Sequence, residues 1–163
     1  MNPGWLAAVL HALAAAPPAA WLRGSGTAYL VVNAAHIAAL GVGVGAAVLM
    51  DLRLLQAVGR RLPLALLGPF LSRAAACGIG LAAVTGLWLF SVRPVDYVDN
   101  PAFLAKLALI ALALVNVWVM HASGRWAAAL QQGMAGCAAR VQALLSLALW
   151  LGAVLAGRWI GFL

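Results

Sequence analysis

Four long stretches of the chain are apolar and contain no charged residue: 24–50, 74–92, 107–124 and 141–157. The hydrocarbon core of a bilayer is about 30 Å thick, and a helix needs about 20 apolar residues to cross it. Strands are unsuitable, because the stretches lack the alternation of a barrel and lipid offers no partner to open backbone groups. The pattern predicts an all-α fold, an integral membrane four-helix bundle.

The predicted spans cover approximately residues 26–50, 73–92, 102–123 and 139–160. Their connections are short, so the whole chain, 1–163, is predicted to form a single transmembrane domain.

Prolines mark two of the three connections. Pro94 and Pro101 are expected to end the second span and to start the third. The other connection, 52–72, contains two further prolines and arginines that recur between leucines. This alternation predicts a short amphipathic segment on the membrane surface.

The first residues form a shorter apolar segment. It is only about a dozen residues long before Pro17 and Pro18 and has no basic start, so it suits neither a span nor a signal peptide. We expect an interfacial helix over 3–16, anchored by Trp5 and Trp21. An uncleaved signal-like segment is the alternative.

Basic residues predict the orientation, because cytoplasmic loops are enriched in Lys and Arg. One side of the predicted bundle carries six arginines, Arg53, Arg60, Arg61, Arg73, Arg125 and Arg140. The other side carries four basic residues and two acidic ones: Arg23, Arg93, Lys106, Arg158, Asp96 and Asp99. We therefore expect the first side to be cytoplasmic, both termini to be periplasmic and the protein to lie in a bacterial inner membrane.

Composition agrees with a lipid environment. Hydrophobic residues make up 66% of the chain and charged residues 8%, against about 25% charged in soluble domains. The net charge of +7 comes from isolated basic residues without interleaved aromatic ones, which excludes a nucleic-acid partner and leaves the bilayer as the expected one. Cys77 and Cys137 fall near the predicted cytoplasmic side, so no structural disulfide is expected.

Glycines cluster within the first two spans, at Gly41, Gly43, Gly45, Gly78, Gly80 and Gly86. Small residues let membrane helices approach closely, so helix packing is the preferred interpretation. A glycine face that makes room for a flat cofactor is the alternative.

Three segments carry a family resemblance: AYLVVNAAHIAALGVGVGAAVLMDLRLL, GIGLAAVTGLWLF and YVDNPAFLAKLALIALALVNVWVMH. Together they resemble an uncharacterised family of small bacterial four-helix membrane proteins, over about residues 21–121. A histidine before a glycine-rich stretch and a later F-x-x-K-x-x-L-x-x-x-x-L-x-N pattern are distantly similar to the membrane domain of the copper-resistance D proteins. The resemblance implies the fold and candidate residues, and the distant one implies copper.

His36 is the first candidate for chemistry, because an imidazole inside an apolar span needs a partner. Neutral imidazole is a common ligand of haem iron, copper and zinc. The alternative is a structural hydrogen bond to Asn33, one turn away, or to a backbone carbonyl of a neighbouring helix.

His121 is the second candidate metal ligand, near the cytoplasmic end of the third span. At 1.5 Å per residue, His36 lies roughly 22 Å from Asp51 and His121 roughly 6 Å from Arg125, so their depths differ by about 16 Å. One haem with both histidines as axial ligands is therefore not expected.

Charged side chains near the outer boundary supply further candidates. Lys106 and Arg93 could bind haem propionates, although Lys106 could also reach the surface or pair with an aspartate. Asp51 and Arg53 are expected to lock the cytoplasmic helix ends through pairs with Arg73 or Arg125.

Copper has its own candidates near the cytoplasmic end: Met50, Met120, His121, Met134 and Cys137. Thioether and thiolate ligands select Cu(I), but methionine in apolar helices usually serves packing.

No hydrolytic machinery is visible, since the chain has no glutamate and no nucleophile motif. The aspartates lie at the predicted boundaries, which argues against a proton-coupled transporter. We therefore expect no enzyme. The leading hypothesis is a b-type haem-binding electron-transfer subunit, with His36 as axial ligand and Asn33 beside it. A copper-handling protein and a cofactor-free accessory subunit are the alternatives, and other membrane subunits or a homo-oligomer are expected partners.

Overall fold

The computed structural model describes residues 4–162, and every regular element in this range is helical. Four of these helices are long and apolar enough to cross a membrane. They are α3 (Gly26–Leu54), α4 (Leu64–Val92), α6 (Pro101–Ala122) and α8 (Cys137–Trp159), and a 3₁₀ turn, η1 (Ile160–Phe162), extends α8. The predicted all-α membrane bundle is thereby confirmed.

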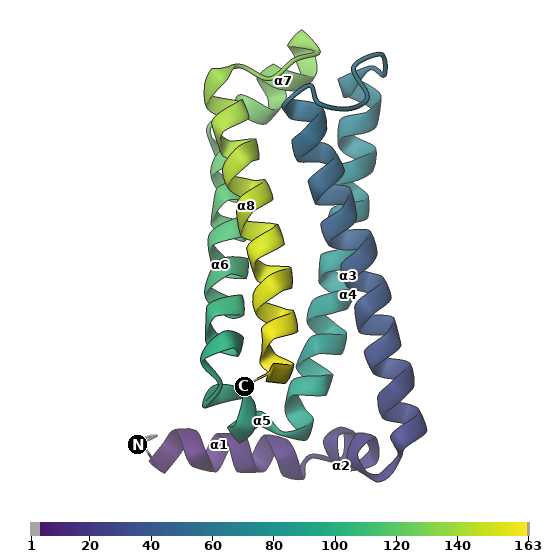
Figure 1. Cartoon of the computed structure of the whole chain (residues 1–163), viewed down its shortest axis with the longest axis vertical. Helices are drawn as coiled ribbons and strands as arrows, with labels where there is room; N and C mark the ends of the chain where they lie inside the picture. The colour runs from purple at the N-terminus through teal and green to yellow at the C-terminus, as the bar shows by residue number, and fades with distance from the viewer. Residues whose placement is uncertain (1–3, 163) are drawn as a thin grey trace.

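The four long helices form two pairs. Helix α3 packs along α4, α6 packs along α8, and the pairs meet mainly along α3 and α8 (Figure 1). Figure 1 shows the chain beginning and ending at the same end of the bundle, where α5 (Pro94–Val98) also lies. We call this the α5 end, and the opposite end, where α7 (Arg125–Gln132) lies, the α7 end.

Two glycines bring α3 and α4 into direct backbone contact. A Cβ atom added to Gly78 would lie 2.9 Å from the Ala39 carbonyl oxygen, and one added to Gly43 would lie 2.7 Å from the Ile79 nitrogen. Both distances are shorter than real Cβ contacts, so only glycine allows this approach. The preferred interpretation, helix packing, therefore holds for Gly43 and Gly78.

Helices α1 (Gly4–Ala15) and α2 (Pro17–Gly24) meet at a 59° bend and lie across the α5 end (Figure 1). Arg23 holds them there, because its guanidinium donates to the Ala14 carbonyl at 2.6 Å and to the Val92 carbonyl at 3.2 Å. The Trp88 indole donates to the Pro18 carbonyl at 3.1 Å. A position across one end of the bundle is where the predicted interfacial helix would have to lie. Residue 3 of that predicted helix lies outside the described residues.

Helix boundaries follow the prolines at the α5 end. Helix α4 ends at Val92, Pro94 begins α5, and Pro101 occupies the first turn of α6. The Asn100 side chain accepts from the Ala102 and Phe103 backbone nitrogens at 3.0 and 3.2 Å, which caps α6. The predicted stop and start are confirmed.

The second long helix begins earlier than the sequence indicates, at Leu64 instead of residue 73. The prediction of a separate surface segment in 52–72 is therefore wrong for the residues from Leu64 onward. These residues form the first turns of α4, despite Pro69. Packing explains the difference: Leu64, Gly68 and Leu71 are buried, and Gly68 lies directly against α7.

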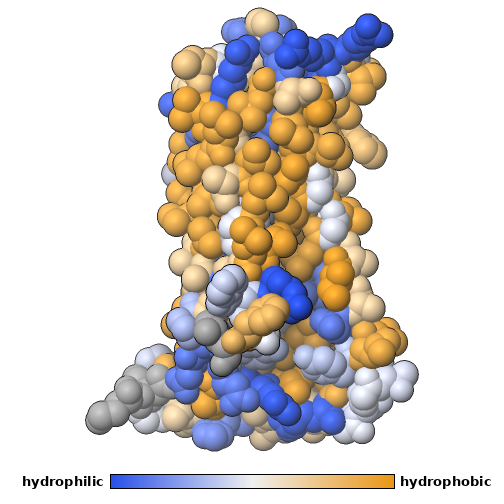
Figure 2. All heavy atoms as spheres, in the orientation of Figure 1, coloured by the Kyte–Doolittle hydropathy of each residue, from blue (hydrophilic) through white to orange (hydrophobic). Residues whose placement is uncertain are grey.

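The surface of the bundle is that of a membrane protein. Large apolar side chains on all four long helices are exposed, including Leu66, Leu87, Trp118 and Leu155. Figure 2 shows apolar side chains covering the middle of the visible face and polar ones gathered at both ends. Such an apolar band between polar ends fits the hydrocarbon core and head groups of a bilayer.

Candidate functional site

Two cavities lie between the helix pairs, one toward each end. The α5-end cavity has a volume of about 840 Å³ and is lined by α3, α4, α5, α6, α8 and η1. The α7-end cavity has a volume of about 640 Å³ and is lined by α3, α4, α6, α7 and α8. Both volumes fall within the usual range of ligand sites, about 300–1,000 Å³.

His36 lines the α5-end cavity, and its ring contacts a hydroxyl group of α4. Nδ1 lies 3.0 Å from the Thr85 hydroxyl oxygen, and that hydroxyl donates to the Leu81 carbonyl at 2.8 Å. A carbonyl only accepts and a hydroxyl has one proton, so both contacts are hydrogen bonds only if Nδ1 carries the proton. The Nε2 atom then holds a free lone pair, the form in which imidazole binds a metal.

The partner of His36 differs from the one considered from the sequence. Thr85, on the neighbouring helix α4, takes the place of Asn33 as the side-chain partner. Asn33 still lines the same cavity as His36. A single threonine hydroxyl inside an apolar helix gave no signal that would have singled it out.

Cationic side chains lie in the outer part of the α5-end cavity. Lys106 and Arg158 both line it, and the Lys106 chain lies against Gly157, where an added Cβ would be 3.4 Å from Lys106 Cδ. Arg93 is exposed and does not line the cavity. The sequence proposed Lys106 and Arg93 as cations near the site, and of these only Lys106 lines the same cavity as His36. Arg158 also lines this cavity, although the sequence analysis did not propose it for the site.

Glycines and aromatic rings shape the rest of this cavity. Gly41 and Gly45 have no neighbour within 4 Å of an added Cβ and face the cavity instead of another helix. At the α5 end, the rings of Phe90 and Phe103 stack at 5.4 Å. Burial and the adjacent Tyr29 raise the pKa of Tyr97, so this phenol is a neutral hydrogen-bonding group of the cavity.

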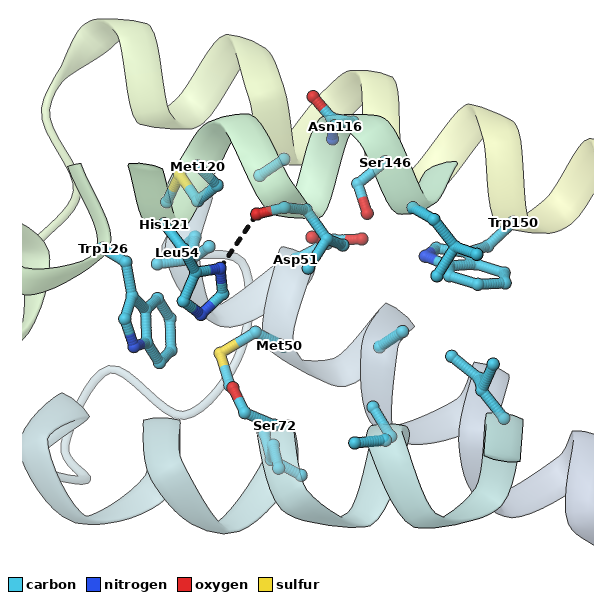
Figure 3. A pocket seen from close by; sticks show the side chains of 18 of the residues that line it. Met50, Asp51, Leu54, Ser72, Asn116, Met120, His121, Trp126, Ser146 and Trp150 are labelled. Atoms are coloured by element: carbon cyan, nitrogen blue, oxygen red, sulfur yellow. Dashed lines mark hydrogen bonds between the residues drawn. The ribbon is translucent and has the colours of Figure 1, made fainter. Parts of the chain in front are cut away.

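His121 lines the other cavity, and its Nδ1 lies 2.8 Å from the Val117 carbonyl (Figure 3). The two histidines therefore face different cavities. Met50 and Met120 share the α7-end cavity with His121, whereas Met134 and Cys137 do not line it. Within residues 4–162, no group of three His, Cys, Asp or Glu residues could hold a metal ion.

Asp51 is the main residue that the sequence interpretation placed wrongly. Its side chain is 6% exposed and lines the α7-end cavity, and its Oδ2 has no hydrogen-bond partner in the described part of the chain. The expected partner Arg125 donates to the Gln142 side chain at 2.9 Å instead. A buried carboxylate is therefore present in the bundle, and the argument from boundary aspartates against such a group is wrong.

Three further polar side chains are buried along this cavity. Asn116 donates to the Gln142 carbonyl at 3.0 Å, and Ser146 lies next to Asp51 (Figure 3). The Trp150 indole is 3% exposed, and its Nε1 has no partner among residues 4–162. None of these residues stood out in the sequence, because which face of a helix meets a cavity depends on packing.

Comparisons with known protein families, with curated proteins and with solved structures gave no match to this chain. The resemblance to the small four-helix family and the distant one to the copper-resistance D proteins therefore stay predictions.

Proposed function

We propose that this protein is a bacterial inner-membrane electron-transfer subunit that binds a b-type haem in its α5-end cavity, with His36 as an axial ligand. One observation carries the proposal: Nδ1 of His36 lies 3.0 Å from the Thr85 hydroxyl, and that hydroxyl donates to the Leu81 carbonyl. We therefore infer that the imidazole proton is on Nδ1 and that Nε2 is the nitrogen that would bind iron. Such outer hydrogen bonds orient the ring and raise the basicity of metal-binding histidines.

The other walls of the cavity fit the same group. Its volume of about 840 Å³ suits a large planar molecule, and Gly41 and Gly45 leave room along α3, whereas the space beside Gly86 holds the His36 ring. Lys106 and Arg158 offer cations to carboxylates at the outer end of the cavity. Asn33 and Tyr97 add neutral hydrogen-bonding groups.

In this proposal the haem supplies one-electron chemistry, and the chain supplies its binding and environment. His36 would hold the iron, Thr85 would hold the imidazole in its binding form, and the apolar walls would exclude water. Electrons would enter and leave through other membrane subunits or a second copy of the chain, which are the partners that we propose.

An absorption spectrum of the protein purified in detergent from haem-replete cells tests this function. We expect a Soret band that His36→Ala abolishes and that His121→Ala, a matched change in the other cavity, leaves in place. A colourless parent protein, or a band that survives His36→Ala, would reject the proposal.

Copper handling is the second candidate, supported by the meeting of Met50, Met120 and His121 at one cavity. Metal analysis of the same sample separates it from the haem proposal. Copper bound above background by the parent and lost in His121→Ala would support it, and a copper-free protein would dismiss it. If the purified protein contains neither haem nor copper, the cofactor-free accessory subunit is the alternative that remains.

A further inference from the structure

The α7-end cavity holds one hydrogen-bond acceptor and one donor that the described chain leaves unsatisfied. The acceptor is Oδ2 of Asp51, and the donor is Nε1 of Trp150. Both side chains are more than nine-tenths buried and line the cavity. An unsatisfied buried polar group costs free energy, and membrane hydrocarbon offers it no partner, so two of them in one cavity point to a bound molecule.

The two groups come from adjacent helices, α3 and α8, and lie near each other in Figure 3. Ser146 and Trp150 are four residues apart on α8, so they occupy neighbouring turns of one face, and Asp51 of α3 lies next to Ser146 (Figure 3). A hydroxyl group is the smallest ligand group that serves both, because it donates to a carboxylate oxygen and accepts from an indole N–H.

The remaining walls indicate what carries that hydroxyl. They are mostly apolar, and Trp126 lies at one end of the cavity with Trp150 at the other (Figure 3). Aromatic side chains favour a flat ring. Arg73 also lines the cavity and disfavours a cationic ligand, although Asp51 alone would attract one. A neutral molecule from the bilayer fits both conditions.

We propose that the α7-end cavity binds a lipid-soluble hydroxylated ring of the quinol class, held by Asp51 and Trp150. A ring hydroxyl donates to the Asp51 carboxylate and accepts from the Trp150 indole. Asn116 and His121 line the same cavity and offer further polar atoms to a second ring oxygen. The Trp150 ring lines both cavities, but the inference concerns the α7-end cavity and does not depend on the haem proposal.

The test is a binding titration of the purified full-length protein in nanodiscs with decylubiquinol, a quinol that has a ten-carbon tail. Trp150→Phe keeps the ring and removes the donor, so we expect the Kd to rise about fivefold to tenfold, the usual effect of one lost hydrogen bond. Asp51→Leu removes the acceptor at similar size, and we expect a loss of at least tenfold.

Matched controls are available on the same chain. Asp96→Leu changes an exposed aspartate of α5, and Trp118→Phe changes a lipid-facing tryptophan of α6 that does not line the cavity. Both are expected to leave the Kd unchanged. Asp51→Leu should also raise the thermal midpoint, because it removes a buried carboxylate whose Oδ2 has no partner in the described chain, so its weaker binding would not reflect unfolding.

Three outcomes would overturn the inference. The first is no saturable binding of decylubiquinol, which would mean that only water occupies the cavity. The second is an equal Kd in the parent, Trp150→Phe and Asp51→Leu, which would place the quinol elsewhere. The third is saturable binding of tetraphenylphosphonium that Asp51→Leu abolishes while the quinol fails to bind, which would make this a cation site.

Discussion

Single hydrogen bonds determine the chemistry of side chains within these apolar helices. Thr85 illustrates this, since one hydroxyl links the His36 imidazole of α3 to the Leu81 carbonyl of α4. In water such a bond would exchange with solvent, but a membrane interior offers few competing partners. The residue that fixes the state of a candidate ligand is therefore a small polar group that is not itself a ligand.

Replacing Thr85 tests this positioning role. Thr85→Val keeps the shape and removes the hydroxyl, so we expect the affinity for haem to fall about tenfold to a hundredfold, as for other outer partners of metal-binding histidines. Haem titration of the apoprotein, followed by absorbance, measures the change. Thr85→Ser retains the hydroxyl and should restore most of the affinity; equal losses in both variants would contradict the role of the hydrogen bond.

At the scale of helices, close backbone contact joins α3 to α4. An alanine at Gly78 would place its Cβ 2.9 Å from the Ala39 carbonyl oxygen, so the helices must separate. We expect Gly78→Ala to lower the free energy of unfolding by about 1–3 kcal/mol, the usual cost of overpacking. Thermal unfolding in detergent measures it. Gly80→Ala, on the same helix with no neighbour within 4 Å, is the control, and equal losses in both would refute the packing argument.

The two N-terminal helices depend on fewer contacts. Arg23 donates to the last turns of both α1 and α4, where helices leave carbonyls without internal partners. We expect Arg23→Met to loosen α1 and α2 from the bundle and to increase the rate of their proteolysis severalfold in detergent. Arg61→Met, an exposed arginine at the α7 end, should leave the rate unchanged. Unchanged cleavage of Arg23→Met would show that Trp88 and apolar contacts suffice.

The elements that the sequence predicts well are those bounded by charge and proline. Helix α3 begins at the predicted residue 26, and α6 begins at Pro101, one residue from the prediction. The start of α4 lies before the predicted one, because the prediction followed the charge-free stretch after Arg73, whereas packing against α7 extends the helix back to Leu64. Helix α7 was not foreseen, although glycines in the left-handed conformation, Gly124 and Gly133, bracket it.

The candidate sites were predictable only as single residues. His36 stands out because it is an imidazole within an apolar stretch, and the separation from His121 follows from helix rise alone. Asp51 is different, because its position near the end of a span is typical of a boundary charge, and its burial results from the packing of α6 and α8 against α3. Such contacts between distant segments leave no local pattern in one sequence.

At the scale of the whole molecule, two helix pairs that meet along α3 and α8 leave a cavity toward each end. The ends differ in charge: the α7 end carries six arginines, and the α5 end carries four basic residues that Asp96 and Asp99 partly offset. Cytoplasmic loops are generally enriched in basic residues, so we expect the more basic α7 end to face the cytoplasm. The proposed haem would then lie near the periplasmic side and the proposed quinol near the cytoplasmic side.

Cysteine labelling of intact cells tests this orientation. After Cys77 and Cys137 are replaced by alanine, single cysteines are introduced as Asp99→Cys between α5 and α6 and as Arg61→Cys between α3 and α4; both positions are exposed. A membrane-impermeant maleimide should label Asp99→Cys from outside, and Arg61→Cys only after permeabilisation. His11→Cys, on the exposed side of α1, should behave like Asp99→Cys, because α1 lies across the α5 end. The opposite pattern would invert the orientation, and labelling of His11→Cys together with Arg61→Cys would mean that α1 and α2 cross the bilayer as a fifth, bent span.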